Sequence, residues 1–173
     1  MSRFASGVTV VTAARGDQRF GMTVSSFVSV SVEPPLVLVC IAKNLQTHVA
    51  IEETRAFAVN ILGIHQLDLA LRFAGMKPEL SHRFVGLSCS TGLTGAPLID
   101  ESIASLDCRL HAIHDGGDHA IFVGEVVAAR ISRDEPALLY HNRLWQRAVT
   151  IEPPTAPKEL PRCDFVFPSF SRR

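Results

Sequence analysis

The sequence lacks a cysteine cluster, a long apolar run and an excess of charge of either sign, and each absence excludes a class of protein. Its four cysteines are scattered without a C-x-x-C pair, which argues against a zinc site or a disulfide framework. The longest apolar run, residues 36–42, is far shorter than the roughly 20 residues that span a bilayer. Seventeen basic and seventeen acidic residues cancel, leaving no electrostatic footprint for nucleic acid or an anionic membrane. Because residues 1–7 also lack the plan of a secretory signal, we expect a cytoplasmic protein.

The common catalytic signatures are absent as well. The chain has no dinucleotide-binding G-x-G-x-x-G, no phosphate-binding loop, no G-x-S-x-G elbow and no H-E-x-x-H helix. His111 and His114 lie three residues apart on an expected strand, so they face opposite sides of it and cannot share a metal. We therefore expect solvated histidines there and no metal site.

What is present is a series of short apolar segments separated by turn residues. Residues 8–14 are β-branched and almost entirely apolar, which predicts a strand buried on both faces. Residues 27–32 alternate apolar and small polar side chains, which predicts a half-buried strand. Further strands are expected at residues 19–24, 36–41, 57–62, 103–114, 119–131 and 138–141.

Helices are few in this pattern. Short helices are expected at residues 48–53, with Thr47 as N-cap, and at residues 66–74, whereas residues 78–95 are expected to be mostly loop. Many strands with two short helices predict a mainly β (α+β) domain over residues 1–151, built as a small antiparallel barrel that leaves few exposed edges.

The last residues, 152–173, form a proline-rich arm. Proline cannot continue a helix or a central strand, so we expect an extended segment. Its three phenylalanines, Phe165, Phe167 and Phe170, favour packing on an apolar surface. With so few helices to cover the barrel, we expect a homodimer.

Two polar segments suit a ligand. Residues 21–27 place three hydroxyls and their backbone N–H groups between two strands, which suits a planar, hydrogen-bonding ligand, or else forms an ordinary Ser/Thr-rich turn. Residues 43–47 place a cation, an amide and a hydroxyl just before an expected helix N-terminus, where phosphate is attracted. Helix capping by Thr47 is compatible with that interpretation.

An ordered series of motifs along residues 4–145 resembles the flavin reductase-like family. The longest are F-A-S-G-V-T-V-V-T at 4–12, G-M-T-V-S-S-F-V-S-V-S at 21–31 and F-A-V-N-I-L at 57–62, with F-A-G at 73–75, G-A-P-L at 95–98, L-D-C at 106–108, G-D-H at 117–119 and G-E-V at 124–126. The resemblance implies an antiparallel split β-barrel homodimer that binds FMN or FAD between subunits and oxidises NADH or NADPH. Family members include the reductase components of two-component flavin monooxygenases.

The resemblance also implies roles for individual residues. The flavin ring would be lined by Thr23, Val24, Ser25 and Ser26, and Cys40 and Ala42 would lie beside the ring or the ribityl chain. The flavin phosphate would be held by Lys43, Asn44 and Thr47. The nicotinamide would be contacted by His119, and flavin or the dinucleotide phosphates by His141 and Arg143. Four alternatives stay open: Cys40 as a redox-active thiol, Asn60 as a flavin contact or a satisfied core amide, Phe73 as an adenine stack or core, and His119 as a solvated turn residue.

The implied function is an NAD(P)H:flavin oxidoreductase that supplies reduced flavin to a separate oxygenase. Two alternatives remain: a flavoprotein that keeps its flavin and passes electrons to a protein, and a non-catalytic flavin-binding module. The sequence leaves the preferred flavin, the preferred nicotinamide and the partner open.

Overall fold

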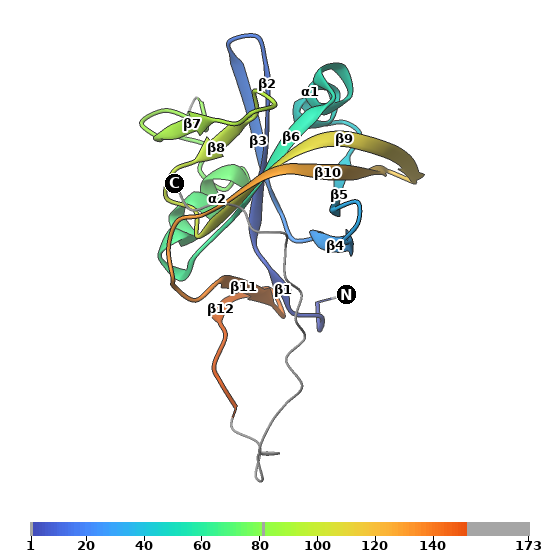
Figure 1. Cartoon of the computed structure of the whole chain (residues 1–173). Helices are drawn as coiled ribbons and strands as arrows, with labels where there is room; N and C mark the ends of the chain where they lie inside the picture. Colours follow the sequence, from blue (N-terminus) through green and yellow to red (C-terminus); the bar gives the residue numbers. More distant parts are fainter. Residues whose placement is uncertain (1, 81, 152–173) are drawn as a thin grey trace.

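The computed structural model describes residues 2–80 and 82–151, and the elements in this part of the chain are mostly strands (Figure 1). The arm at residues 152–173, with its three phenylalanines, lies outside the described residues. The elements in chain order are β1 (Ser6–Gly7), β2 (Thr9–Arg15), β3 (Gln18–Val24), β4 (Val28–Ser31), β5 (Leu36–Ala42), α1 (Gln46–Thr54), β6 (Ala56–Ile61), the 3-10 turn η1 (Ile64–Gln66), α2 (Leu67–Phe73), β7 (Cys89–Thr91), β8 (Pro97–Ile99), β9 (Ala104–Gly116), β10 (His119–Ile131), β11 (Leu138–His141) and β12 (Leu144–Arg147).

The main sheet has seven strands in the order β3-β2-β6-β9-β10-β5-β4, and all neighbours are antiparallel. Its two edge strands, β3 and β4, are consecutive in the chain, so residues 25–27 connect one edge of the sheet to the other. In this connection the Ser26 hydroxyl accepts from the Cys40 N–H at 3.0 Å and donates to the Cys40 carbonyl at 3.2 Å, beside β5. The connection therefore closes the sheet, and the expected antiparallel split barrel is confirmed.

Strand β2 is buried on both faces, as its sequence predicts. Val11 packs in a cluster with Phe57 and Phe122 that α1 covers, whereas Val10 packs on the opposite side with Phe73 of α2. Successive residues of a strand point to opposite faces, so an uninterrupted apolar run serves two cores at once.

The strand expected at residues 27–32 is real but is not half-buried. Val28 and Val30 of β4 are 52% and 48% exposed, and Val32 just after the strand is 47% exposed. Alternation predicts that one face will be covered, and in a single chain nothing among the described residues covers it. The outer face of the barrel here is consequently apolar.

The expected cap of α1 is wrong. The helix begins at Gln46 with Leu45 as N-cap, and no side chain caps it, while Thr47 is buried within the first turn. A capping hydroxyl must stand just outside the helix, and Thr47 is already inside it because the Leu45 carbonyl accepts from the His48 N–H at 3.1 Å.

Four short strands are missed by the sequence pattern. β1 contains two residues, and β7 and β8 contain three each, too few to show periodicity. β12 follows a two-residue turn in which Asn142 and Arg143 both have positive φ, 51° and 64°. Two positive φ values are what a type I′ hairpin requires, but the pair lacks the glycine that usually signals one.

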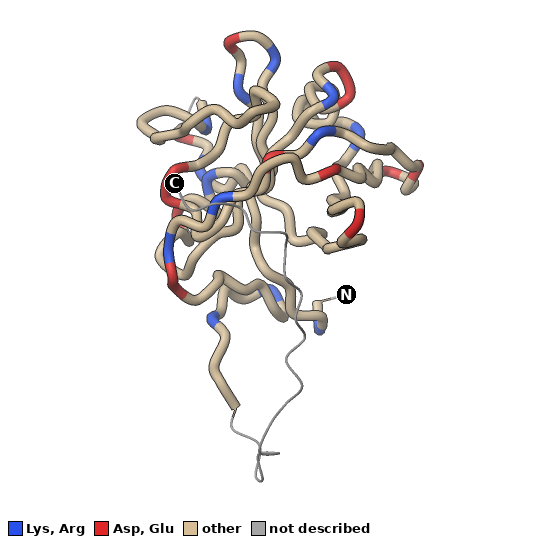
Figure 2. Tube along the Cα trace, in the orientation of Figure 1, with Lys and Arg blue, Asp and Glu red and all other residues tan. Residues whose placement is uncertain are grey.

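Charge is distributed without a dominant sign. Figure 2 shows basic and acidic residues interspersed along the trace of the described chain, in keeping with the balanced composition. Within residues 2–80 and 82–151, no helix has the length and apolar character needed to cross a membrane.

Candidate functional site

A pocket of about 230 Å³ opens where the end of β3 and its connection to β4 meet the end of β5 and the start of β10. Its lining consists of Met22, Thr23, Val24, Ser25, Ser26, Cys40 and His119. These residues come from three segments separated by long stretches of chain. The structure thus brings the hydroxyl-rich segment, the cysteine and the histidine singled out from the sequence to one place.

His119 reaches the pocket through a tight hairpin. Strand β9 ends at Gly116 and β10 begins at His119, and Gly117 between them has a φ of 80°, which glycine tolerates in the first central position of a type II′ turn. The register then pairs His119 with Ala42 and Ile121 with Cys40 of β5. Paired residues share a face, so His119 and Cys40 both lie on the half-exposed side of the sheet.

The hydroxyl-rich segment is held by three different contacts. The Thr23 hydroxyl donates to the Ala70 carbonyl of α2 at 2.7 Å, and the Val24 carbonyl accepts from Thr9 at 2.9 Å. Ser26 is fastened to Cys40, and Ser25 is exposed at the pocket. Because β3 is an edge strand, its outward backbone groups have no ladder partner. The Gly21 carbonyl accepts from Arg83 at 3.0 Å, whereas the outward groups of the pocket-lining residues 22–24 remain available to a ligand.

The His119 ring has a carboxylate neighbour. The Asp118 carboxylate accepts a hydrogen bond from His119 Nδ1–H at 2.7 Å, which leaves Nε2 as the other polar atom of the ring. The hydrogen bond and the charge of His119 lower the pKa of Asp118 below its usual value. Asp118 therefore stays ionised and restrains the ring beside the pocket.

Lys43 follows β5 and is bound to the β9–β10 hairpin at two points. Its backbone N–H donates to the Asp118 carbonyl at 3.1 Å, and its ammonium group forms an ion pair with the Asp115 carboxylate. The hydrogen bond from Lys43 lowers the pKa of Asp115. Asn44 is exposed next to Lys43, and Thr47 is buried; with Ala42 they adjoin the pocket along the chain but do not line it.

Asn60 does not line the pocket. It is fully buried in β6, where its amide group donates to the Val10 carbonyl and to Thr12, both at 3.1 Å. Its carbonyl oxygen accepts from the Ile99 N–H at 2.8 Å and from the Ser105 hydroxyl at 3.0 Å. The alternative of a satisfied core amide is the one that the hydrogen bonds support.

Phe73 also belongs to the core and not to the pocket. Its ring is 1% exposed and meets Phe84 edge-on, with the ring centroids 5.1 Å apart. His141 and Arg143 lie on the β11–β12 hairpin, which forms a separate three-stranded sheet with β1. Within one chain the structure does not bring these three residues to the pocket lining.

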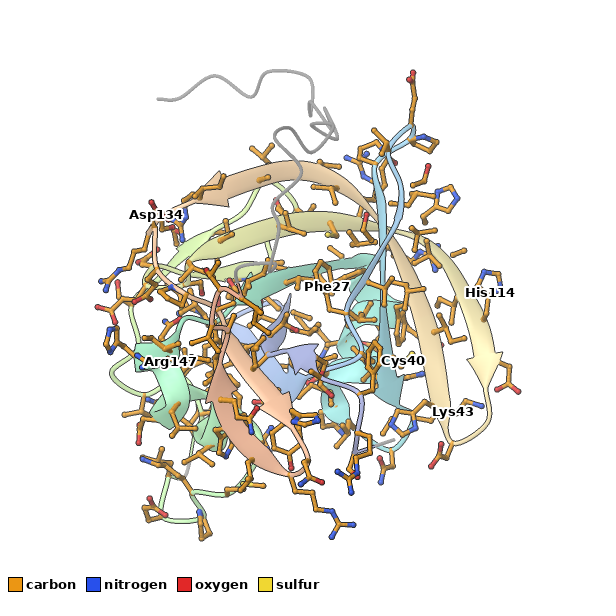
Figure 3. The ribbon with its side chains drawn as sticks, turned by 90° about the horizontal axis from the view of Figure 1, so that it is seen from below. Phe27, Cys40, Lys43, His114, Asp134 and Arg147 are labelled. Carbon is orange, nitrogen blue, oxygen red and sulfur yellow. The ribbon has the colours of Figure 1, made fainter. Side chains whose placement is uncertain are left out.

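Figure 3 shows the pocket residue Cys40 and the neighbouring Lys43 from below. Cys40 and Lys43 lie on one side of the molecule, away from Asp134 and Arg147 on the other.

Cys40, Cys89 and Cys108 are free thiols, and burial raises the pKa of Cys108 and of Cys89. In the described ranges no three His, Cys, Asp or Glu side chains gather as metal ligands would, and His111 and His114 are exposed.

Three residues near the site escape the reasoning from sequence. Met22 lines the pocket, whereas within residues 21–27 the sequence singled out only the hydroxyls and backbone N–H groups. Asp115 and Asp118 read as turn residues, but they are also the partners of Lys43 and His119. The signal available for Asp118 was its position beside His119, whereas nothing in the sequence places Asp115 next to Lys43.

Comparison with known proteins agrees with this geometry. The family model described as "Flavin reductase like domain" matches residues 1–148. The chain is 42% identical over 128 residues to the NADH-dependent FAD reductase of Streptomyces globisporus, covering 73% of this chain and 70% of that protein. It is 37% identical over 149 residues to the reductase component of 4-hydroxyphenylacetate 3-monooxygenase from Thermus thermophilus, covering 86% and 93%.

A solved structure shows the same fold. The NADH:FAD oxidoreductase SgcE6 of Streptomyces globisporus C-1027 matches with a TM-score of 0.79 and 37% sequence identity, covering 86% of this chain and 89% of that chain.

Proposed function

Because this chain belongs to the flavin reductase-like family, we propose that it is an NAD(P)H:flavin oxidoreductase that supplies reduced FMN or FAD to a separate oxygenase. The observation that carries the proposal is the convergence of Thr23–Ser26, Cys40 and His119 on one pocket. We further propose that it acts in the cytoplasm, given the scattered free thiols.

The pocket fits a flavin ring. A planar heterocycle needs backbone donors and small hydroxyls along one edge and an apolar surface beneath it. The outward backbone of β3 and the exposed Ser25 hydroxyl supply the first, and Met22 and Cys40 supply the second. Lys43 and Asn44, next along the chain from β5, are the groups that would hold the phosphate.

The two nucleotides together supply the hydride-transfer chemistry, so the protein's task is binding and orientation. Ser26 holds the β3–β4 connection against β5 and keeps the donor-bearing backbone of residues 23–26 in place. Asp118 restrains His119, whose Nε2 can then position the nicotinamide against the flavin ring. Such a site requires no catalytic acid or base.

The experiment that tests the function is oxidation of NADH and NADPH by the purified full chain, with FMN, FAD and riboflavin added in turn. We expect oxidation that depends on added flavin and a nearly colourless purified protein. A yellow protein that retains stoichiometric flavin would favour the electron-carrier alternative. Absence of NADH and NADPH oxidation with all three flavins would reject the reductase and favour a non-catalytic flavin-binding module.

We also propose that the protein is a homodimer whose contact includes the apolar outer face of β4. Val28 and Val30 of β4, and Val32 just after it, expose about half of their surface each, and β4 is an edge strand beside the pocket-lining strand β5. Exposed apolar side chains on an edge strand favour pairing with another chain.

Light scattering is expected to give a mass of twice 18.9 kDa for the wild type at micromolar concentration. Val30→Glu should shift the mass towards the monomer, because it places a charge in the apolar contact. Val85→Glu is the matched control, since Val85 is 61% exposed in the connection between α2 and β7, away from β4. A wild-type mass near 18.9 kDa, with or without flavin, would contradict the homodimer.

A further inference from the structure

The residue expected to hold the flavin phosphate already has an anionic partner. Lys43 Nζ forms an ion pair with the Asp115 carboxylate, which stands at the end of β9, 72 residues along the chain. Both side chains are substantially exposed, at 44% for Lys43 and 78% for Asp115. The lysine is therefore within reach of a solute while it is paired with a carboxylate that also receives a backbone hydrogen bond from Gly117.

The backbone keeps the pair together. Lys43 N–H donates to the Asp118 carbonyl at 3.1 Å, and Ala42 pairs in register with His119, so the β5 end and the hairpin tip are joined next to the ion pair. The backbone of Asp115 therefore stays close to Lys43, so its carboxylate remains near the ammonium group when another anion approaches.

A phosphate that binds Lys43 must displace Asp115 or accept its repulsion. Like charges at close range disfavour one another, and an ammonium group shared between two anions binds each less tightly than it binds one. Tight retention of flavin is also unwanted in an enzyme that hands reduced flavin to a separate protein.

We propose that Asp115 competes with the flavin phosphate for Lys43 and so lowers the affinity for phosphorylated flavins, which keeps the flavin exchangeable. This inference rests on the proposed reductase function and on Lys43 as the phosphate-binding cation. Asp115 acts through Lys43 and is a tuning residue, not a catalytic one.

The test is a titration of FMN and of riboflavin, which lacks the phosphate, into the wild type and Asp115→Asn. Asp115→Asn should tighten FMN binding by roughly three- to tenfold, the scale of an exposed charge interaction, and slow FMN dissociation in stopped flow. Riboflavin binding should stay within about twofold, because it offers no phosphate to Lys43. Asp17→Asn, on the distant β2–β3 turn, changes the net charge equally and should leave both affinities unchanged.

The double variant separates competition from a structural role. Lys43→Ala should weaken FMN binding. Asp115→Asn added to it should have no further effect on FMN affinity, because the cation for which Asp115 and the phosphate compete is gone. Weaker or unchanged FMN binding in Asp115→Asn, equal tightening of riboflavin, or a gain that persists without Lys43 would each overturn the proposal. Failure of the reductase function shows separately, as a wild type that oxidises neither NADH nor NADPH with any added flavin.

Discussion

His119→Ala should lower kcat/KM for NADH by roughly 30- to 1000-fold while flavin affinity barely changes, the equivalent of about 2–4 kcal/mol in the transition state. His119 lies on β10 at the rim of the pocket, opposite Ala42, and its ring is restrained by Asp118. Loss of the ring removes a positioning contact to the nicotinamide and loosens the alignment on which hydride transfer depends. Melting temperature should change little, because the side chain is 44% exposed.

Stopped-flow reduction of the flavin-bound variant by NADH measures this effect directly. His114→Ala is the matched control, because His114 is an exposed histidine on the neighbouring strand β9 and does not line the pocket. Its reduction rate should equal that of the wild type. If His119→Ala also keeps the wild-type rate and NADH affinity, His119 is a solvated turn histidine with no part in the reaction.

Asn60→Ala should destabilise the protein by about 3–5 kcal/mol, which for a chain of this size lowers the melting temperature by roughly 8–15 °C. The substitution leaves the Val10 carbonyl and the Ile99 N–H without their partner in a fully buried environment. Buried polar groups without partners carry the full cost of lost hydration. The effect should appear in thermal or urea unfolding, with flavin affinity of the folded fraction nearly unchanged.

Ser105→Ala provides the matched comparison for Asn60. It removes one of the four hydrogen bonds that the Asn60 side chain makes, and it should cost only about 1 kcal/mol. The opposite pattern for Asn60→Ala, with wild-type stability and a large loss of flavin affinity, would return this residue to the flavin site.

Local patterns in the sequence determined most of the strands and the class of fold. The apolar run at residues 8–14 predicted a strand buried on both faces, and β2 is one, because alternation of side chains is a property of a single strand. The turn residues between 114 and 119 predicted the long β9–β10 hairpin in the same way. Hydroxyl clustering at residues 23–26 likewise marked one wall of the pocket, since those residues are neighbours in the chain.

Contacts between distant segments were decided only by the tertiary structure. An asparagine in an apolar strand looks the same in the sequence whether it binds a ligand or makes hydrogen bonds within the core. Only the packing of β2, β8 and β9 around β6 gives Asn60 its hydrogen-bond partners and makes it a core residue. Thr47 lost its expected capping role because the helix began one residue before it. Lys43 and Asp115 are brought together by the register of β5 with β10. That register depends on the length and geometry of every element and turn between the two strands. No local pattern records such a register, and so the sequence suggested the cation but not the carboxylate that holds it.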